Sequence, residues 1–369
     1  MTTKEKVLEI LTNSNKGNKT NLGLNFSEYI DSNLQSVSGE YLAQECGVSR
    51  TAIWKTINKL RKEGFLIEGT TNGGYILKNN TDAFDKELFL QYFTSSFPLF
   101  KNSHVECFSE IDSTNTYSKR LMAENGSFRD AKGQLTDFGN IYHNSVIVAE
   151  SQTAGRGRMG RTFYSPKKTG IYLSVIYSPE GGITQPAEIT AFSAVAVCRA
   201  IRKLYKIKPA IKWINDIFIN NKKVCGILTE GFTNFETGTI EAAIIGIGVN
   251  IEDNPDFFPE DVAKIAGGIL QKDEEKKAGR CQLAAEIAGQ VLTILTEAPE
   301  SVMAEYKEDV FIIGKQVEIH PVIGDDKANY NATVIDIDNN ASLVVKLNDG
   351  TVKTLSSGEI SLISSSFAD

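Results

Sequence analysis

Residues 146–161 read VIVAESQTAGRGRMGR, an apolar run followed by three glycines and three arginines within the seven positions 155–161. A backbone this rich in glycine can approach a ligand closely and take up positive φ. Arginine forks bind phosphate or carboxylate oxygens through two parallel hydrogen bonds. The stretch therefore predicts a phosphate-handling loop behind a buried strand, and the alternative is an exposed basic turn between two strands.

The glycines of this loop also match the dinucleotide fingerprint G-x-G-x-x-G at Gly155, Gly157 and Gly160. That fingerprint has meaning only between a strand and a helix. Residues 170–177, GIYLSVIY, are β-branched and aromatic and are typical of another strand. The context therefore excludes a Rossmann-type site.

Length and composition set the class of protein. The chain has 369 residues, of which 41% are hydrophobic and 23% charged, which suits a globular protein of two or three domains. It starts MTTKEK and has no apolar run long enough for a signal peptide or a membrane span, so we expect a cytoplasmic protein without a membrane partner. The five scattered cysteines predict neither disulfides nor a zinc site, and we expect no metal-ligand residues. With a net charge of −7, any DNA binding must come from a local patch.

Residues 38–60, SGEYLAQECGVSRTAIWKTINKL, have the spacing of a helix-turn-helix. Ser38 and Ser49 are expected to cap the two helices, and Gly47 to close the first. Strand patterns at 65–67 and 75–77 flank the turn-forming stretch 70–74, so a hairpin follows and completes a winged helix. A short helix at 4–11 and a polar loop at 12–25 precede this module.

The second helix of this module has one apolar face, which carries Ile53, Ile57 and Leu60, and is basic elsewhere. Basic residues on a recognition helix and its ends contact phosphates, which favours DNA binding over a purely dimerising module. The predicted DNA-binding residues are Ser49, Arg50, Thr51, Trp54, Lys55, Asn58 and Lys59.

Residues 211–219 and 222–230 read as two strands around the turn Asn220-Asn221. With a two-residue loop, Phe218 lies opposite Lys223, and Asp216 becomes the diagonal neighbour of Lys223, on a face shared with Lys212 and Ile214. An ordinary surface ion pair is the favoured interpretation of this pattern by itself. Trp213 alternates to the other face and is expected in the core.

Two further stretches have bare or polar faces. In residues 242–250, AAIIGIGVN, glycines 246 and 248 leave one strand face without side chains and lead to Asn250. Such a face admits a ligand or another backbone, or a closely packed helix. The stretch Asp112-Ser-Thr-Asn115 follows a strand pattern at 105–111 and can cap a helix at 116–122, or its free N–H groups can meet a polar ligand.

The C-terminal part, 312–369, has strand patterns at 315–319, 332–336, 342–347 and 351–355. Turn signals at 324–326, 338–340 and 348–350 separate them. A small β-barrel is the natural interpretation.

Taken in order, GRGR-x-GR after a strand, K-W-x-N-D, K-x-x-G-I-L and G-x-G-x-N resemble a bifunctional biotin protein ligase and biotin operon repressor over nearly the whole chain. The resemblance implies an α+β multidomain fold. Its parts are an N-terminal winged helix-turn-helix (1–80), a central α/β, class II synthetase-like ligase domain (84–310) and a C-terminal SH3-like β-barrel (312–369).

The activity that the resemblance implies is ATP-dependent activation of biotin to biotinyl-5′-AMP, followed by transfer to a lysine of biotin carboxyl carrier protein. Mg²⁺ is expected with ATP. The implied DNA partner is an operator of biotin genes, with a possible homodimer on the DNA. Two alternatives stay open, a ligand-sensing regulator with weak ligase activity and a lipoate or octanoate ligase.

Site roles follow by motif from the same resemblance. The implied biotin-binding residues are Ser113, Thr114, Asn115, Gln152, Arg156, Gly157, Arg158 and Lys223. The implied ATP and adenylate-binding residues are Arg158, Arg161, Lys212, Asn215 and Asn250. The implied catalytic residues are Arg158, Lys212, Lys223 and Asp216, and the glycines of close approach are Gly155, Gly246 and Gly248.

The chain departs from the family pattern at four places. Ile214 stands where proline is usual, which relaxes a backbone constraint, and Met159 stands where a further arginine is common. The connection 125–144 and the stretch 12–36 are longer than usual. None of these departures removes a named ligand group.

Overall fold

The computed structural model describes residues 2–14, 36–69, 74–78, 82–130, 132–234, 238–272, 274, 277–321 and 329–362. The chain divides into two compact units, Met1–Lys101 with Glu275–Glu286, and Asn102–Glu274 with Ile287–Asp369. None of the helices within the described ranges combines the length and apolar character needed to cross a membrane. All five cysteines lie in these ranges and are present as thiols.

The first unit contains the predicted helix-turn-helix. Its elements are α1 (Thr3–Ser14), β1 (Val37–Ser38), α3 (Gly39–Cys46), α4 (Arg50–Lys62), β2 (Ile67–Gly69), β3 (Gly74–Leu77), α5 (Lys86–Ser96) and η1 (Pro98–Phe100). The Ser38 hydroxyl accepts from the N–H of Tyr41 at 3.1 Å, and that of Ser49 from Ala52 at 3.2 Å. Gly47 ends α3 with φ 65°, so all three predicted caps are confirmed.

The apolar face of α4 is also confirmed, because Ile53, Ile57 and Leu60 are fully buried. The hairpin that follows is antiparallel, and β1 completes a sheet of order β1-β3-β2. Its first strand starts at Ile67, later than predicted, since the N–H of Phe65 still donates to Leu60 O. The turn residues 70–73 lie outside the described residues. Residues 15–35 also lie outside the described residues. Helix α1 continues to Ser14, although a loop was predicted to start at residue 12.

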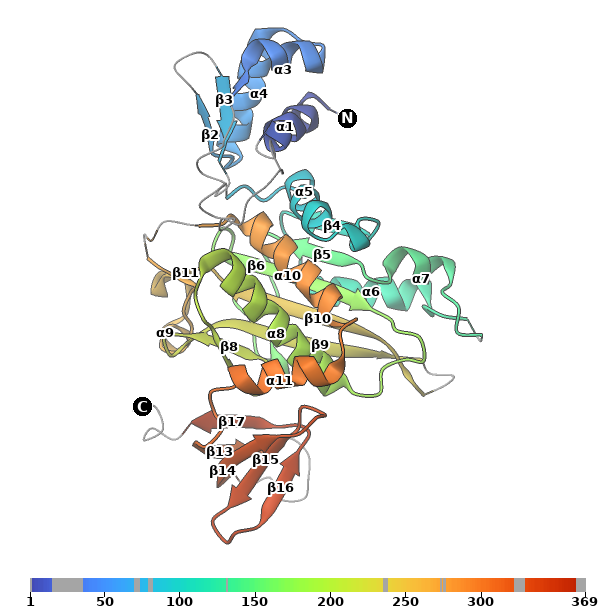
Figure 1. Cartoon of the computed structure of the whole chain (residues 1–369), viewed down its shortest axis with the longest axis vertical. Coiled ribbons are helices and arrows are strands. Elements are labelled where there is room, and N and C mark those ends of the chain that lie inside the picture. The colour runs from blue at the N-terminus through green and yellow to red at the C-terminus, as the bar shows by residue number, and fades with distance from the viewer. Residues whose placement is uncertain are drawn as a thin grey trace. The chain divides into compact units, whose positions relative to one another are not determined.

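The second unit is built around a seven-stranded sheet of order β4-β5-β6-β10-β9-β8-β7 (Figure 1). Its helices and strands before residue 275 are β4 (Val105–Phe108), α6 (Thr114–Asn125), α7 (Asp137–Tyr142), β5 (Val146–Ala149), η2 (Arg158–Gly160), β6 (Gly170–Tyr177), α8 (Pro186–Tyr205), β7 (Ala210–Lys212), β8 (Asp216–Ile219), β9 (Lys222–Thr233), β10 (Ile240–Asn250), β11 (Glu252–Asp253), η3 (Pro255–Phe257), α9 (Glu260–Ala263) and β12 (Leu270–Gln271). Helix α10 (Arg280–Ile294) belongs to this unit only from Ile287 onward, and it is followed by α11 (Pro299–Asp309). Only β4 and β5 pair in parallel, and the other neighbours in this sheet are antiparallel.

The two faces of this sheet carry different helices because side chains alternate along each strand. Thr190 of α8 donates to Thr229 of β9 at 2.8 Å, so α8 covers one face. Asn115 of α6 donates to Leu228 O at 3.2 Å and lies over Gly246 on the other face. Strand β10 is thereby buried on both sides. The next regular strand after the glycine-arginine loop is β6, which confirms that no Rossmann-type turn is present.

The prediction of one strand over 211–219 is wrong. Strands β7 and β8 are separate and antiparallel, with Lys212 directly opposite Asp216, and Trp213-Ile214-Asn215 forms the turn between them. The peptide bond between Trp213 and Ile214 is cis. Trp213 is buried, as expected, but through this turn and not through strand alternation.

The long connection 125–144 packs against the end of the sheet. Phe128 and Phe138 form an apolar cluster with Met122, Ile176 and Ile244. It is therefore an ordered part of the core along its described residues.

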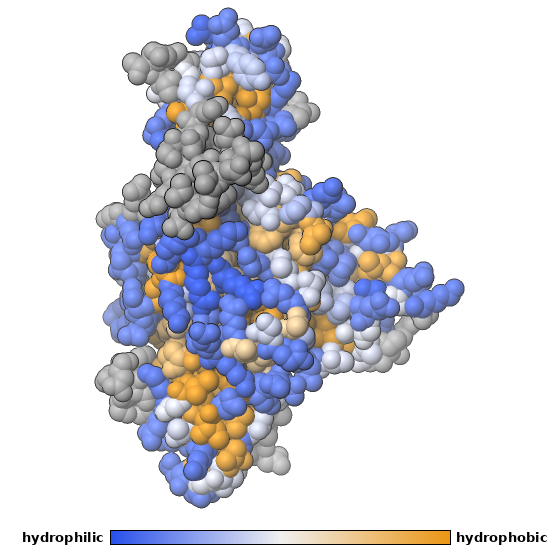
Figure 2. All heavy atoms as spheres, in the orientation of Figure 1, coloured by the Kyte–Doolittle hydropathy of each residue, from blue (hydrophilic) through white to orange (hydrophobic). Residues whose placement is uncertain are grey.

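The C-terminal residues form a five-stranded antiparallel sheet of order β16-β15-β14-β13-β17. Its strands are β13 (Gln316–His320), β14 (Tyr330–Ile337), β15 (Leu343–Leu347), β16 (Val352–Leu355) and β17 (Glu359–Leu362). Four strands were predicted, β17 was not, and the predicted turn at 324–326 lies outside the described residues. Figure 2 shows a hydrophobic area over this sheet, whose exposed apolar side chains include Ile335 and Val352.

Candidate active site

A pocket of ≈ 660 Å³ opens in the second unit, among the central sheet, the glycine-arginine loop and strand β17. Nearly all of the predicted ligand-binding residues line it. These are Ser113, Thr114, Asn115, Gln152, Arg156, Gly157, Arg158, Arg161, Lys212, Asn215, Asp216, Lys223, Gly246, Gly248 and Asn250. Gly155 does not line the pocket; its position is fixed from within the loop.

One end of the pocket is neutral and polar, and it is built on the first turn of α6. Ser113 caps this helix, and Asp112 instead pairs with Arg120. Gln152 accepts from the N–H of Thr114 at 2.9 Å, and its amide donates to Ser165 at 2.9 Å. The side chains at this end are held in fixed orientations by their neighbours, which suits recognition of a polar, uncharged group.

Glu230 organises the same end, and sequence reasoning did not identify it. Its carboxylate accepts from Asn115 at 2.9 Å and from Lys119 at 2.6 Å, and Arg156 is 3.7 Å away. Burial alone would raise the pKa of Glu230, but the hydrogen bonds from Lys119 and Asn115 hold it below its usual value. The period-two spacing of Gly226, Leu228 and Glu230 is the signal that could have placed this residue on the pocket face.

The bare face of β10 forms the floor of the pocket. A Cβ at Gly246 would lie 2.2 Å from Asn115 Oδ1, and one at Gly248 would lie 2.4 Å from the Phe163 ring. The close approach predicted for these glycines is therefore made by two of the protein's own side chains. Larger residues there would displace both of them.

The glycine-arginine loop folds into a small hairpin. Gly157 N–H donates to Arg161 O at 2.8 Å, and Phe163 N–H donates to Gly155 O at 2.9 Å. A Cβ at Gly155 would lie 2.3 Å from Phe163 O, which explains the glycine there. Met159 takes positive φ at the tip and is exposed, so it is not part of the pocket lining.

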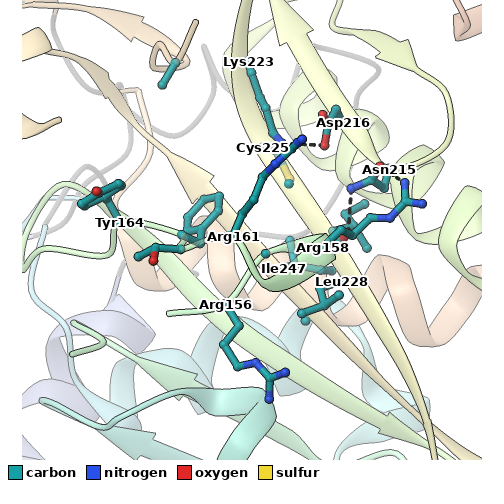
Figure 3. A pocket seen from close by; sticks show the side chains of 18 of the residues that line it. Arg156, Arg158, Arg161, Tyr164, Asn215, Asp216, Lys223, Cys225, Leu228 and Ile247 are labelled. Carbon is teal, nitrogen blue, oxygen red and sulfur yellow. Dashed lines mark hydrogen bonds and ion pairs between the residues drawn. The ribbon is translucent and has the colours of Figure 1, made fainter. Parts of the chain in front are cut away.

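The other end of the pocket is cationic. Lys223 Nζ lies 2.7 Å from Asp216 Oδ1, and Arg158 Nη1 donates to Asn215 Oδ1 at 2.9 Å (Figure 3). The Asp216–Lys223 pair was predicted from strand register, and Phe218 lies opposite Lys223 as expected, with a bulge between Ile217 and Phe218. The ion pair expected from the sequence is present, and it lines the pocket with both side chains partly exposed.

Lys212 lies at the same end of the pocket. Burial lowers the pKa of its ammonium group, and Asp216 opposes that shift while Lys223 adds to it. An anion placed between Lys212 and Lys223 would favour the charged form of Lys212. The arrangement is therefore suited to hold two anionic groups close together.

The C-terminal sheet contributes directly to the pocket, which sequence reasoning did not foresee. Arg158 Nη2 donates to Gly358 O at 3.1 Å, and Arg161 Nη2 donates to Glu359 Oε2 at 2.6 Å. No local sequence pattern identifies Gly358 or Glu359, because their partners in the loop are 200 and 198 positions away along the chain.

Two predicted ligand residues that line the pocket contact other parts of the protein in this structure. Figure 3 shows Arg156 pointing away from Arg158, Asn215 and Asp216, and its partner is Glu230 at the neutral end. Asn250 donates to Gly267 O at 3.1 Å and so holds the segment after η3 against the sheet.

The described residues contain no group of three or more His, Cys, Asp or Glu side chains that could hold a metal ion. Asp216 Oδ1 is buried and lies 2.7 Å from the Lys223 ammonium group. Asp216 is thus an acidic side chain beside the cationic end of the pocket. This donor set fits an ion held largely by phosphates and water.

In the first unit, the predicted DNA-binding residues gather on α4. Ser49, Arg50, Thr51, Trp54, Lys55 and Lys59 are exposed. Asn58 is half-buried and accepts from Arg61, which also donates to Ile67 O and so joins the helix to the hairpin. An indole that is 56% exposed on a basic helix is available for contacts outside the domain.

Three family models match the chain in succession. They are an HTH domain at residues 29–76, the biotin/lipoate A/B protein ligase family at 129–250, and the biotin protein ligase C terminal domain at 312–363. The bifunctional ligase/repressor BirA of Bacillus subtilis is 33% identical over 241 residues, which are 65% of this chain and 68% of that protein. The chain belongs to the family of bifunctional biotin ligase/repressors.

Other members support the same assignment over more of the chain. The bifunctional ligase/repressor BirA of Escherichia coli is 28% identical over 330 residues, covering 88% of this chain and 92% of that protein. The solved biotin protein ligase from Aquifex aeolicus in complex with biotin and ATP matches with a TM-score of 0.53 at 21% identity, over 70% of this chain and 98% of that one. That likeness concerns the fold alone.

Proposed function

We propose that this chain activates biotin with ATP to form biotinyl-5′-AMP and then transfers biotin to a lysine of biotin carboxyl carrier protein. The observation that carries the proposal is the single pocket with a neutral end at Thr114, Asn115 and Gln152 and a cationic end at Lys212 and Lys223. A ligand with a polar uncharged ring system and a carboxylate fits these two ends.

At the neutral end, the ring system of biotin is held by Ser113, Thr114, Asn115 and Gln152. Glu230 keeps the Asn115 amide in one orientation. The apolar part of the ligand lies against Asn115 and the Phe163 ring, which cover Gly246 and Gly248. Gly157 and Arg158 close over biotin from the loop, and Arg156 reaches biotin only after leaving Glu230.

At the cationic end, adenylation requires a carboxylate and a phosphate to approach each other, so their mutual repulsion must be screened. Lys223 neutralises the biotin carboxylate and Lys212 the α-phosphate, with Arg158 spanning both. One carboxylate oxygen attacks the α-phosphorus, and the bond to pyrophosphate breaks in line. No enzyme nucleophile takes part, and catalysis rests on positioning and charge.

Arg161, Asn215 and Asn250 complete the nucleotide site in this proposal, and Asp216 orients the two lysines. Asp216 is a protein carboxylate that would help to hold a Mg²⁺ ion brought in with ATP, and such an ion would supply charge to screen the phosphates. In the second half-reaction the acceptor lysine attacks the biotinyl carbonyl carbon, and AMP leaves.

We also propose the finer architecture that the family resemblance implies. The domains are a winged helix at 1–80, a class II synthetase-like ligase domain at 84–310 and an SH3-like barrel at 312–369. The β2–β3 hairpin and the five antiparallel strands of the C-terminal sheet support this division. ATP-dependent chemistry and the five thiols support a location in the cytoplasm.

The second proposed function is repression of biotin genes through the winged helix. Its α4 enters the major groove, and Arg50, Lys55 and Lys59 contact phosphates while Trp54 contacts bases or sugars. A homodimer on the operator follows from the resemblance. A gel shift with a biotin-gene promoter, with and without biotinyl-adenylate, tests this function.

The ligase proposal is tested with purified protein, ATP, Mg²⁺ and a carrier domain. We expect biotin on the acceptor lysine by mass spectrometry, and biotinyl-adenylate bound to the protein as purified. Acceptance of lipoate or octanoate in place of biotin would refute the substrate assignment. Tight binding of biotin without turnover would favour the ligand-sensing regulator.

A further inference from the structure

The turn Trp213-Ile214-Asn215 determines the geometry of the cationic end. It separates Lys212 from Asp216, which face each other across β7 and β8, and it carries Asn215, whose Oδ1 accepts from Arg158. A proline at position 214 would fix one backbone dihedral of this turn, whereas Ile214 does not. The constraint on the turn must therefore come from contacts with other elements.

One such contact is made by Tyr306 of α11. Its hydroxyl donates to Ile214 O at 3.2 Å, and the side chain is fully buried. Burial raises the pKa of Tyr306 well above its usual range, so the phenol remains a donor. Without it, the Ile214 carbonyl would lose its partner inside the core.

The chain that leaves α11 makes a second contact with the same segment. The N–H of Phe311 donates to Ile211 O at 3.2 Å, and Val310 bridges Ile211 in parallel. The two hydrogen bonds, to Ile211 and to Ile214, lie on either side of Lys212. The backbone that carries this lysine is thus held at both ends by α11 and its continuation.

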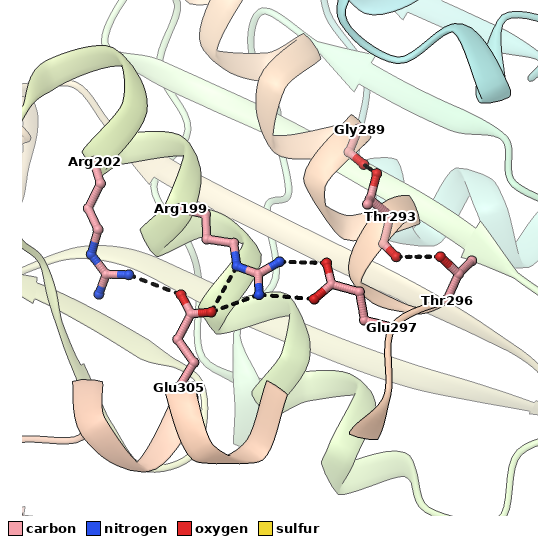
Figure 4. Close-up of polar contacts among 7 residues, drawn as sticks. All are labelled: Arg199, Arg202, Gly289, Thr293, Thr296, Glu297 and Glu305. Atoms are coloured by element: carbon pink, nitrogen blue, oxygen red, sulfur yellow. Dashed lines mark hydrogen bonds and ion pairs between the residues drawn. The ribbon is translucent and has the colours of Figure 1, made fainter. Parts of the chain in front are cut away.

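Helix α11 is itself fastened to α8 by a charged network (Figure 4). Arg199 bonds Glu305 at 2.7 Å and Glu297 at 2.6 Å, and Arg202 bonds Glu305 at 3.1 Å and also contacts Asp309. Glu305 therefore accepts from two arginines one turn apart on α8. Several coupled, partly buried pairs of this kind hold a helix better than one isolated surface pair.

We infer that Tyr306 is a positioning residue for adenylation: α11, fixed on α8, holds the Ile211–Asn215 backbone through Tyr306 and thereby sets Lys212 and Asn215. The inference rests on the proposed ligase function. Tyr306 touches no substrate, and it acts through the turn. Displacement of a catalytic group by about 1 Å can lower a rate by about 100-fold, so a small shift of the turn has a large effect.

The first test compares Tyr306→Phe with Tyr205→Phe, which removes a hydroxyl from another fully buried tyrosine that does not line the pocket. We expect Tyr306→Phe to lower kcat for biotinyl-adenylate formation about tenfold with little change in KM for biotin. Tyr205→Phe should leave kcat unchanged at a similar loss of thermal stability. Equal kinetics in both variants would overturn the inference.

The second test asks whether Tyr306 acts through the two groups that the turn positions, Lys212 and Asn215. In a Lys212→Ala, Asn215→Ala background, Tyr306→Phe should cause less than about a twofold further loss of kcat, because both positioned groups are already absent. A full tenfold further loss would indicate a merely structural role and would contradict the inference.

Glu305→Gln provides a variant outside the core if Tyr306→Phe does not fold. It weakens the attachment of α11 to α8, and we expect a threefold to fivefold loss of adenylation kcat. An unchanged kcat there would count against the inference. Wild-type protein that forms no biotinyl-adenylate would refute the proposed function instead, so the two failures are distinguishable.

Discussion

Replacement of Arg158 by alanine should release biotinyl-adenylate prematurely. In the structure the guanidinium is already oriented, because Nη1 donates to Asn215 Oδ1 at 2.9 Å and Nη2 to Gly358 O at 3.1 Å. Its remaining N–H groups are available to a phosphate or carboxylate oxygen without a further loss of side-chain entropy. Arg158→Ala removes both this donor and one of the two hydrogen bonds that join the loop to the C-terminal sheet.

The size of the effect follows from the bonds lost. A hydrogen bond between charged groups contributes about 1.5–3 kcal/mol. Taking about 2–3 kcal/mol for the phosphate contact of a prepositioned arginine, the dissociation rate of the adenylate should rise about 30- to 150-fold. Arg158→Lys keeps the charge and loses the fork, so its dissociation rate should fall between those of wild type and Arg158→Ala.

The assay is the half-life of a preformed complex with labelled biotinyl-adenylate, followed by rapid gel filtration. Lys167→Ala is the matched control, since it removes a cation from the same connection but outside the pocket lining, where Lys167 pairs with Glu150. The control should retain the adenylate as wild type does. Arg158→Ala with an unchanged half-life would refute the assigned role of the loop.

Three other changes give further predictions. Glu359→Gln should lower KM for ATP by up to about fivefold, the upper end for an exposed ion pair, because it frees Arg161 for phosphate; an increase in KM would contradict this. Lys212 has a lowered pKa in the free protein and must be charged to neutralise phosphate. The kcat/KM of adenylation should therefore fall at a pH below the usual range for a lysine, and Lys212→Arg should move this fall to higher pH. Lys59→Ala should weaken DNA binding equally for all sequences and lower the magnitude of the salt slope by about 1, whereas Trp54→Ala should weaken binding without changing that slope.

Local physics explains the parts of the fold that could be predicted. The hydrogen bonds of the caps Ser38, Ser49 and Gly47 reach residues at most four positions away, so these caps can be predicted from the sequence. Strand alternation placed the bare face of Gly246 and Gly248 correctly in the pocket. It could not show what fills that space, since Asn115 and Phe163 come from other segments.

The sequence also determined which residues meet at the site, through motifs whose order is typical of one family. It did not determine the turn at 213–215, because WIN lies within an apolar, β-branched run that favours a continuous strand. The turn is held by partners far along the chain: Trp213 donates to Ala341 O across 128 positions, and Ile214 accepts from Tyr306 across 92. Local propensity therefore specified the helices, the strands and the set of ligand residues. Only the tertiary structure, through buried hydrogen bonds between distant segments, decided how Lys212, Asn215 and Arg158 are placed around the pocket.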